Sequence, residues 1–419
     1  HGQLSDMGGI YTLGVSPGTV IRNNVFHDVL SNPRVSGGWG IYFDEGSTDI
    51  LAENNLVYNT LTGTLHQHYG RENRVQNNIF AYSHRGQLIR SRQEDHISFF
   101  FERNIVYFNN GLLLGSNWGN DNFKLDHNCY WDSSGERVDF AGQSFEEWQA
   151  RGHDVHSIVA DPGFADPEHG DFRLAADSPA LQVGFKPFDT STAGLYGDPA
   201  WVARPRAIAR EPFSPPQPPE PVTVSDGFEA TPPGTLAAGA ATLGEEGDAQ
   251  IRVTDAIAAT GKHSLKITDA PGLQYSYNPH LVYGPHLRKG TVAGAFALRL
   301  EPGAIMYHEW RDSRNPYRVG PSIWFDGAGN LSASGKGLLQ VPLGEWVRIE
   351  IECALGVEAD GTYTLRVTLP GQEPRVFEGL ACGNPQFSRL DWWGFVANGT
   401  ESAIFYLDDV DIHTRTATE

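Results

Sequence analysis

Five asparagines recur along the first part of the chain, and each opens the same kind of short phrase. The asparagine is followed by β-branched, aromatic or other apolar residues, in NVFHDV, NLVYNT, NIFAYS, NIVYFN and NCYWDS. The phrases start 31, 23, 26 and 24 residues apart, at Asn24, Asn55, Asn78, Asn104 and Asn128. Strand-forming residues at a fixed phase of such a repeat are typical of a solenoid of parallel β-coils.

A second column of residues precedes each asparagine by about 13 to 15 positions. Two columns predict at least two strands in each coil, with like positions stacked about 4.8 Å apart. We therefore predict a parallel β-helix over residues 1–205. The column runs through Gly9-Ile10-Tyr11, Gly40-Ile41-Tyr42, Gly63-Thr64-Leu65, Gly86-Gln87-Leu88 and Gly111-Leu112-Leu113.

A change of composition marks a second domain. Residues 206–221 contain the proline-rich stretch EPFSPPQPPEP, which is typical of a semi-rigid linker. Beyond it, residues 222–419 alternate apolar and polar residues between Gly, Asn and Pro turns, and we predict a two-sheet jelly-roll β-sandwich. The predicted strands include HSLKITD, GAFALRL, WVRIEIEC, YTLRVTL and IFYLDDVDI.

Two shorter segments follow the repeat. Ser144–Ala150 is predicted to form a helix with a capping box, Ser144 at its N-cap and Glu147 three residues later. Residues 161–181 are rich in Asp, Pro and Gly, and we expect turns and a short strand that close the C-terminal end of the solenoid.

The net charge of −20 excludes nucleic acid and anionic membrane surfaces as favoured partners. No run of about 18 apolar residues predicts a membrane span. Of the three cysteines, Cys129 lies in an apolar phrase and is expected to be a buried free thiol, whereas Cys353 and Cys382 are candidates to pair.

The chain begins at HGQLSDMGG, without a signal peptide, and its first coil already carries the richest motif. An open solenoid end exposes strand edges, so we expect further coils to precede this segment. A secreted or periplasmic bacterial protein is expected, with its signal outside the sequence given.

Alternation along the strands predicts which side chains face outward. With Ile10 and Ile41 inside, Tyr11, Tyr42 and Asp44 point out of the solenoid. Counting from Asp44, the next coils place Gln67 and then Arg90 at the same position, and Glu45 is followed by His68. His66, Arg92 and Trp118 lie close to this predicted outer surface, and Trp39 lies on the same strand as Tyr42.

Two carboxylates on this surface would suffice for glycoside hydrolysis, which needs one protonated acid and one ionised nucleophile or base. Asp44, or Glu45 beside it, and Asp6 in the preceding turn come from neighbouring coils. A separation of roughly 5 to 10 Å spans both stereochemical classes. The alternative for each is an ordinary turn residue.

The remaining candidates have two readings each. His66 and His68 lie on one strand face and either bind a metal or, as we favour without a third ligand, bind sugar hydroxyls or orient Asp44. Arg90 and Arg92 either receive a ligand carboxylate or balance the acidic cluster. Trp39 and Trp118 either stack on sugar rings or pack in the core.

In the second domain, Phe228-Glu229 lies near the first predicted strand and Asp408-Asp409 lies in the last. Glu229 and Asp409 are candidate ligands for a structural calcium ion, and ordinary turn carboxylates are the alternative. Trp392 and Trp393 offer a binding platform or half of a sandwich core. No organic cofactor is implied.

With DMGGIYTLG, GWGIYFDEGS and HQHYG in place, residues 1–200 resemble bacterial right-handed parallel β-helix carbohydrate-active enzymes. The nearest likeness is to glycoside hydrolase family 141, with a looser one to β-helix β-xylosidases. The resemblance implies paired acids on adjacent coils, at Asp6 and Asp44. A β-xylosidase would have Glu in the coil that here holds His66, Gln67 and His68. The second half resembles concanavalin-type or carbohydrate-binding sandwiches.

Three functions follow from these patterns. The first is a glycosidase acting on a plant or algal polysaccharide or oligosaccharide. The second is a polysaccharide lyase on an acidic glycan, which Arg90 and Arg92 favour and the scarcity of Lys disfavours. The third is a non-catalytic carbohydrate-binding or surface protein.

Overall fold

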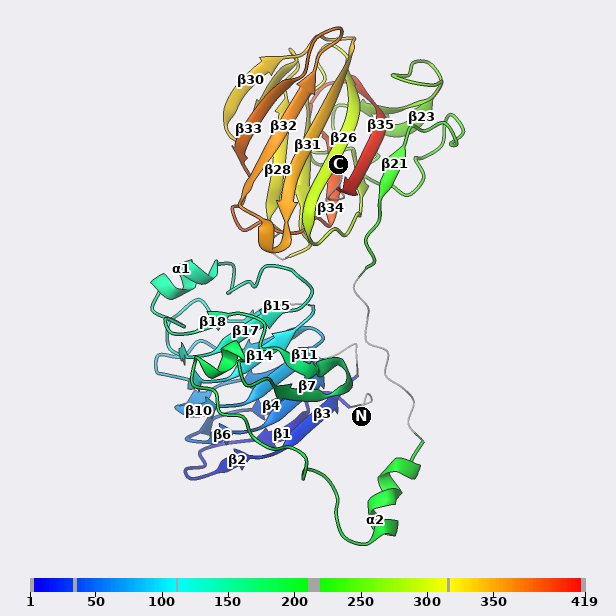
Figure 1. The fold of residues 1–419 in the computed structure, drawn as a ribbon. Coiled ribbons are helices and arrows are strands. Elements are labelled where there is room, and N and C mark those ends of the chain that lie inside the picture. The colour runs from blue at the N-terminus through cyan, green and yellow to red at the C-terminus, as the bar shows by residue number, and fades with distance from the viewer. Residues whose placement is uncertain (1–3, 33–35, 111, 210–218, 315–316, 416–419) are drawn as a thin grey trace. The chain divides into compact units, whose positions relative to one another are not determined.

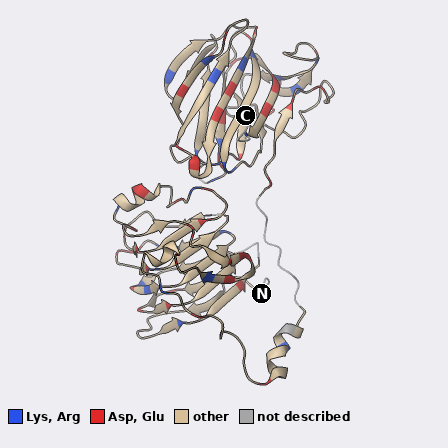
Figure 2. Cartoon of the chain, viewed as in Figure 1, with Lys and Arg blue, Asp and Glu red and all other residues tan. Residues whose placement is uncertain are grey.

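The computed structural model describes residues 4–32, 36–110, 112–209, 219–314 and 317–415 (Figure 1). The chain forms two compact units, residues 1–134 with 138–218 and residues 219–419 with 135–137. No helix among the described residues has the length and hydropathy to cross a membrane. Acidic and basic residues are scattered along the chain in both units (Figure 2). The proline-rich residues 210–218 lie outside the described residues.

The first unit is the predicted solenoid of about five coils, in which each coil contributes one strand to each of three parallel sheets. The first sheet contains β1 (Gly8–Thr12), β4 (Trp39–Phe43), β8 (Gly63–Gln67), β12 (Gly86–Arg90) and β15 (Leu112–Ser116). The second contains β2 (Val20–Arg22), β6 (Leu51–Glu53), β10 (Asn73–Gln76), β13 (Phe99–Glu102) and β16 (Lys124–Asp126). The third contains β3 (Val25–Val29), β7 (Leu56–Thr60), β11 (Ile79–Ser83), β14 (Ile105–Phe108), β17 (Cys129–Asp132) and β18 (Ile158–Val159). The short strands β5 (Ser47–Thr48) and β9 (Gly70–Arg71) pair separately.

The repeated asparagines form a buried ladder at the turn between the second and third sheets. The Asn78 Oδ1 accepts hydrogen bonds from the Asn55 backbone N–H at 2.9 Å and from the Asn55 side chain at 3.0 Å. Asn78 bonds to Asn104 in the same way, at 2.9 and 3.0 Å. Since each turn amide needs a partner inside the solenoid, the ladder explains why one polar residue recurs among apolar ones.

The predicted register between coils is wrong by one residue at two steps. Trp39, rather than Gly40, pairs with Gly63, and Gly86 pairs with Leu112. A shift of one residue moves every following side chain to the opposite face of a strand. Gln67 therefore pairs with the buried Phe43, and Arg90 pairs with Gln67. Both side chains were predicted on the outer surface, and both point into the solenoid instead.

The segments after the last coil are only partly as predicted. α1 (Phe145–Ala150) has the expected capping box, with Ser144 and Glu147 bonded reciprocally at 2.8 and 3.2 Å. The prediction that residues 161–181 close the solenoid end is wrong. Phe164 and Phe172 pack on tyrosines of the third sheet, whereas Val138, Phe140 and Trp148 extend the core at the end. The elements here are β19 (Phe164–Asp166), η1 (Pro167–His169), β20 (Asp171–Leu174), η2 (Pro179–Leu181), α2 (Pro199–Ala203) and η3 (Arg204–Ala207).

The second unit is the predicted β-sandwich of two antiparallel sheets. The larger sheet contains β21 (Val224–Asp226), β23 (Gln250–Thr254), β24 (Ser264–Asp269), β26 (Gly290–Leu300), β31 (Trp346–Leu355), β32 (Thr362–Thr368), β33 (Arg375–Ala381) and β35 (Ala403–Thr414). The seven-stranded sheet contains β22 (Ala241–Leu243), β25 (His280–Tyr283), β27 (Met306–Arg311), β28 (Val319–Phe325), β29 (Asn330–Ala333), β30 (Lys336–Gln340) and β34 (Trp392–Ala397). η4 (Gly356–Glu358) follows β31. The five strands predicted from sequence are β24, β26, β31, β32 and β35.

All three cysteines are buried and free. Burial raises the pKa of the Cys129 thiol to about 12, so it is an inert apolar residue, as expected. Cys353 contacts Cys382 without a disulfide bond, and this contact together with burial raises the pKa of the Cys353 thiol.

Candidate active site

Three rings stack in register on the outer face of β1, β4 and β8. Tyr11 pairs with Tyr42, and Tyr42 pairs with His66. The Tyr42 and His66 rings lie parallel with centroids 4.6 Å apart, and the Tyr11 ring meets Tyr42 edge-on at 4.8 Å. Trp39 lies against both, 4.4 Å from Tyr42 and 4.5 Å from His66. The corrected register therefore puts His66 in line with the tyrosines, and Gln67 pairs with Phe43 instead of lying in line with Asp44.

Asp44 follows directly after β4 and is held by two tyrosines. The Tyr42 hydroxyl donates to Asp44 Oδ1 at 2.8 Å, and the Tyr11 hydroxyl donates to Asp44 Oδ2. The backbone N–H of Asp44 bonds to Thr12 of the preceding coil at 3.0 Å. These contacts fix the carboxylate from both sides, and the side chain is only 5% exposed.

Asp6 reaches the same tyrosine from the preceding coil. Its Oδ1 lies 3.2 Å from the Tyr42 hydroxyl, so this oxygen and Asp44 Oδ1 are at most about 6 Å apart. Asp6 adopts a left-handed backbone conformation with φ of 51°, and its N–H bonds to Ser36 at 3.0 Å. The predicted meeting of the two carboxylates on adjacent coils is thus present, and Asp6 itself is exposed.

The electrostatics of the site separate the roles of its groups. Burial alone favours the neutral form of Asp44, but hydrogen bonds from Tyr11 and Tyr42 outweigh it and hold the pKa of this carboxyl below its usual range. The bond to Asp44 raises the pKa of Tyr11 to about 12, and burial raises that of Tyr42 further. Burial, aided by nearby His68, lowers the pKa of His66 to about 3. At neutral pH Asp44 is therefore ionised, both tyrosines are protonated and His66 is neutral.

His68 completes this group, which we call the Asp44 site: Asp6, Tyr11, Trp39, Tyr42, Asp44, His66 and His68. The two histidine rings meet edge-on at 5.8 Å, in line with the prediction that they share a strand face. His66 Nε2 contacts the Ser91 hydroxyl, a partner that sequence reasoning did not single out. His66 Nδ1 is buried and has no hydrogen-bond partner among the described residues.

Other predicted residues lie elsewhere. The Gln67 side chain accepts from Asn73 at 3.1 Å inside the solenoid. Arg90 is fully buried, donates to Asn117 and Asn120 at 2.9 and 2.7 Å, and covers the Phe123 ring. Trp118 is a core residue, packed on the same phenylalanine at 4.9 Å. Glu45 and Arg92 are exposed, and Glu45 directly follows Asp44.

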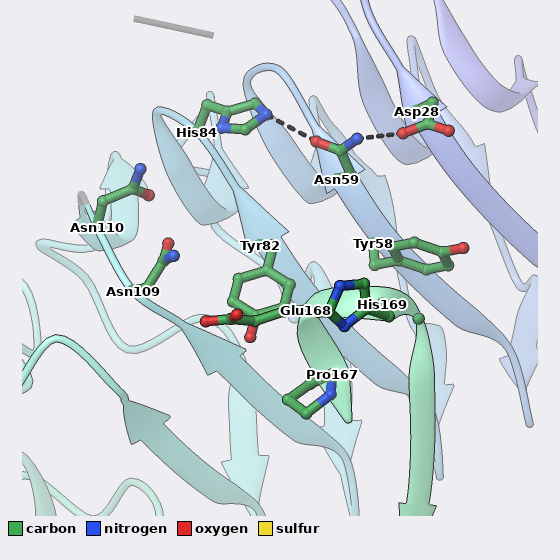
Figure 3. A pocket seen from close by; sticks show the side chains of 11 residues that line it. Asp28, Tyr58, Asn59, Tyr82, His84, Asn109, Asn110, Pro167, Glu168 and His169 are labelled. Carbon is green, nitrogen blue, oxygen red and sulfur yellow. Dashed lines mark hydrogen bonds between the residues drawn. The ribbon is translucent and has the colours of Figure 1, made fainter. Parts of the chain in front are cut away.

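A separate pocket of about 500 Å³ lies on the third sheet (Figure 3). One wall is a hydrogen-bonded row from successive coils, in which His84 Nε2 donates to Asn59 at 2.8 Å and Asn59 donates to Asp28. Tyr58, Tyr82 and the β19–β20 hairpin complete it. Asp28, Asn59 and Tyr82 all have a left-handed backbone conformation, with φ of 52 to 53°. The backbone therefore bends in the same way at this point of three successive coils. The lining of the pocket includes two carboxylates, Asp28 of β3 and Glu168 of η1.

Within the described residues, His and carboxylate groups converge in metal-binding fashion at one cluster, Asp126, His127 and His156. Asp126 Oδ2 lies 2.8 Å from His156 Nδ1 and 3.3 Å from His127 Nδ1. Two imidazoles and one carboxylate are a donor set that suits a divalent transition metal. The sequence signal was an Asp-His pair followed by a histidine one coil later.

The predicted calcium ligands of the sandwich are engaged with one loop. Glu229 accepts the backbone N–H groups of Lys262 and His263 at 2.7 and 2.8 Å. Asp409 accepts from the Thr260 hydroxyl at 2.7 Å, and its neighbour Asp408 is buried. Calcium at Glu229 and Asp409 stays a prediction.

No protein-family model matches this chain, and no curated protein matches it. Among solved structures, a glucuronan lyase from the fungus Trichoderma reesei matches at 13% identity over 44% of this chain and 94% of its own, with a TM-score of 0.34. An alginate lyase from Aplysia kurodai matches at 11% identity over 42% and 91%, with a TM-score of 0.31. Lectin I-B4 from Griffonia simplicifolia matches at 9% identity over 46% and 100%, with a TM-score of 0.33. At this level of similarity none of them assigns an activity to the chain.

Proposed function

We propose that the solenoid is a glycoside hydrolase that cleaves a plant or algal polysaccharide or oligosaccharide at the Asp44 site. One observation carries the proposal: carboxylates from two adjacent coils reach the same Tyr42 hydroxyl. Glycosidases need two acids on opposite sides of the scissile bond. The resemblance of residues 1–200 to family 141 β-helix hydrolases points the same way, and such an enzyme would act outside the cytoplasm.

The spacing favours retention of configuration. Retaining enzymes hold their carboxyl groups about 5 to 5.5 Å apart, whereas inverting enzymes need about 6.5 to 9.5 Å to admit a water molecule. An upper limit of about 6 Å between the facing oxygens of Asp6 and Asp44 fits the first class. Asp44, kept ionised by Tyr11 and Tyr42, would attack the anomeric carbon.

Asp6 would then be the general acid. Tyr42 has a single proton, and it donates that proton to Asp44 at the shorter distance. A protonated Asp6 can donate its own proton to the Tyr42 oxygen, or to the leaving glycosidic oxygen when substrate is bound. Being exposed, Asp6 is accessible to a leaving group, and deprotonated Asp6 can activate the water that releases the sugar.

The other members of the site would hold the sugar. Tyr11, which is 41% exposed, offers ring surface to a sugar. His68 lies close enough to Asp44 to help lower the pKa of its carboxyl, and it would donate hydrogen bonds to sugar hydroxyl groups. The neutral His66 ring and the Trp39 ring both pack against the Tyr42 ring. Metal binding by His66 and His68 would need a third ligand, and the group of three candidate ligands found among the described residues lies elsewhere, at Asp126, His127 and His156.

A polysaccharide lyase is the second candidate, favoured by the tyrosines and histidines as potential bases. It needs a cationic group to neutralise the uronate carboxyl. Arg90, predicted to do this, is buried below the sheet, and only Arg92 is exposed. The raised pKa values of Tyr11 and Tyr42 oppose phenolate formation, so hydrolysis is the better fit.

Product analysis distinguishes the two reactions. The chain would be incubated with a panel of neutral and acidic plant and algal polysaccharides. We expect new reducing ends without ultraviolet absorbance from a new C=C bond, and a first product that keeps the anomeric configuration. Absorbing products would establish the lyase, and absence of any product across the panel would support a binding protein.

The acidic limb of the pH profile tests the role of Tyr11. Because Asp44 must be ionised, kcat/KM should fall as pH drops through its pKa. The Tyr11→Phe variant lacks a hydrogen bond that favours the carboxylate, so the pKa of Asp44 should rise and the limb should move to higher pH. Tyr196→Phe, at an 85% exposed tyrosine, is the control. A limb that stays in place in Tyr11→Phe would disprove this role.

A further inference from the structure

The outer face of the seven-stranded sheet carries large aromatic side chains where a solvated sheet would carry small polar ones. Along β27 the residues alternate, with His308 and Trp310 buried in the core and Tyr307, Glu309 and Arg311 facing out. Neighbouring strands continue the row. We call the outward set the aromatic strip: Tyr275, Tyr277, Tyr307, Arg311, Trp324 and Trp392.

Trp392 has a built seat on this face. A Cβ atom placed on Gly394 would lie 1.9 to 2.5 Å from three atoms of the Trp392 six-membered ring. The indole therefore lies across Gly394, and any larger residue there would displace it. Trp393, the other half of the predicted pair, is fully buried, so one tryptophan of the pair forms a platform and the other packs the core.

Arg311 lies over the Trp392 ring and covers part of that face. Its guanidinium carbon lies 4.0 Å from the Trp392 ring centroid and 4.7 Å from that of Tyr317. Glu309 pairs with it at 2.6 Å and also accepts from the Ser322 hydroxyl at 3.1 Å. The charge of Arg311 is therefore compensated, while its planar fork remains ordered and able to donate.

A second platform lies one strand further. The Tyr307 and Trp324 rings are parallel with centroids 5.4 Å apart, and Trp324 is 36% exposed. It forms a wall of a pocket of about 440 Å³ that is lined by hydroxyl groups of Ser322, Ser332 and Ser334. On the other side of Trp392, Tyr275 and Tyr277 stack at 4.9 Å.

The strip thus crosses the strands β34, β27 and β28, which spans roughly 10 Å at ordinary strand spacing, and it continues into the loop before β25, where Tyr275 and Tyr277 lie. Flat rings alternate along it with a compensated Arg–Glu pair and with serine hydroxyls. Tyr275, Tyr277 and Trp324 are 36 to 46% exposed, and exposed apolar surface bordered by polar groups is typical of a binding surface. Sugar rings match it, since they combine apolar C–H faces, which pack on aromatic rings, with hydroxyl edges that need donors and acceptors.

We infer that the aromatic strip is a binding site for an uncharged polysaccharide chain, separate from the Asp44 site and involving no catalysis. An acidic glycan would need a free cationic group, and the nearest guanidinium is already paired with Glu309. The inference does not depend on hydrolysis by the solenoid.

Affinity gel electrophoresis of the full chain tests it, with hydroxyethyl cellulose, arabinoxylan and galactomannan as neutral probes and polygalacturonate as the acidic one. We expect at least one neutral polymer to retard the protein. Trp392→Ala should weaken this binding by about tenfold or more, and Trp324→Ala should weaken it less. Gly394→Ala keeps Trp392 but removes its seat, and it should weaken binding as well.

The matched control is Trp346→Ala, a partly buried tryptophan of β31 on the larger sheet, which should bind normally. Thermal unfolding of each variant separates loss of binding from loss of fold. Asp44→Asn should be retarded as strongly as the parent, and Trp392→Ala should cleave small soluble substrates normally, so this site and the hydrolase can fail independently. Retardation by no neutral polymer, or retardation unchanged in both Trp392→Ala and Gly394→Ala, would overturn the inference.

Discussion

Replacing Asp44 with asparagine is expected to lower kcat by about 10³-fold or more, since an amide can neither attack an anomeric carbon nor accept a proton. Asn keeps the shape and the oxygen that accepts from Tyr11, so the fold should persist. Asp6→Asn removes the proposed acid and should cost about 10²- to 10⁴-fold. Reducing-end release by purified variants on the substrate found for the parent measures both effects.

Two nearby carboxylates serve as controls. Asp49 is exposed, and its left-handed backbone, with φ of 62°, tolerates asparagine, so Asp49→Asn should retain full activity. Because Glu45 directly follows Asp44 at the end of β4, the Glu45→Gln variant tests which of these two acids is required. It should also remain active. Normal turnover by both Asp44→Asn and Asp6→Asn would remove the basis for the hydrolase, and a collapse only in Glu45→Gln would move the nucleophile by one residue.

The combined variant adds a further check. Groups that act in one catalytic step do not contribute additively, because the second loss finds little left to remove. The double variant Asp6→Asn with Asp44→Asn should therefore be only slightly slower than Asp44→Asn alone. If the losses of activity in the two single variants multiply in the double variant, the two acids act independently. That result would contradict the joint action that we infer from their shared contact with Tyr42.

The repeat was predictable because buried polar groups are rarely free to vary. An asparagine inside a coil must bond to the coils on both sides, so Asn55, Asn78 and Asn104 recur at the same phase and mark each turn of the solenoid. The three parallel sheets follow from that phase. The sandwich strands were predictable for another reason, since apolar and polar residues alternate with a period of two.

The register within each coil was less predictable because the turns vary in length. Thirteen residues separate Tyr42 from Asn55, but twelve separate His66 from Asn78. Glycine columns alone do not show which turn has lost the residue. Because side chains along a strand alternate between its two faces, an error of one residue in the register reverses the predicted face. Arg90 was therefore expected at the surface, whereas it lies in the core.

The contacts that define the Asp44 site were beyond the reach of the sequence. It predicted that Asp6 and Asp44 would come from adjacent coils, but not that Tyr42 would reach both. That contact depends on the left-handed backbone of Asp6 and on the turn at Ser36 that bonds to it. Such turns have no periodic signal.

The Asn78→Ala variant should destabilise the solenoid by about 2 to 4 kcal/mol. Alanine removes the acceptor for the Asn55 backbone and side-chain N–H groups and the donor to the Ala52 carbonyl, and all of these lie where water cannot replace them. Asn24→Ala is the matched control, because Asn24 ends the ladder, is only partly buried and accepts no bond from a further asparagine among the described residues. It should cost about 1 kcal/mol or less.

Urea unfolding followed by circular dichroism measures the difference. Because the chain has two compact units, one transition should shift to lower urea in Asn78→Ala while the sandwich transition stays in place. Equal shifts in Asn78→Ala and Asn24→Ala would mean that the buried Asn78 contributes no more to stability than the partly buried Asn24 at the end of the ladder. A shift of both transitions would mean that the two units unfold together, and the loss would then be distributed over the whole chain rather than confined to the solenoid.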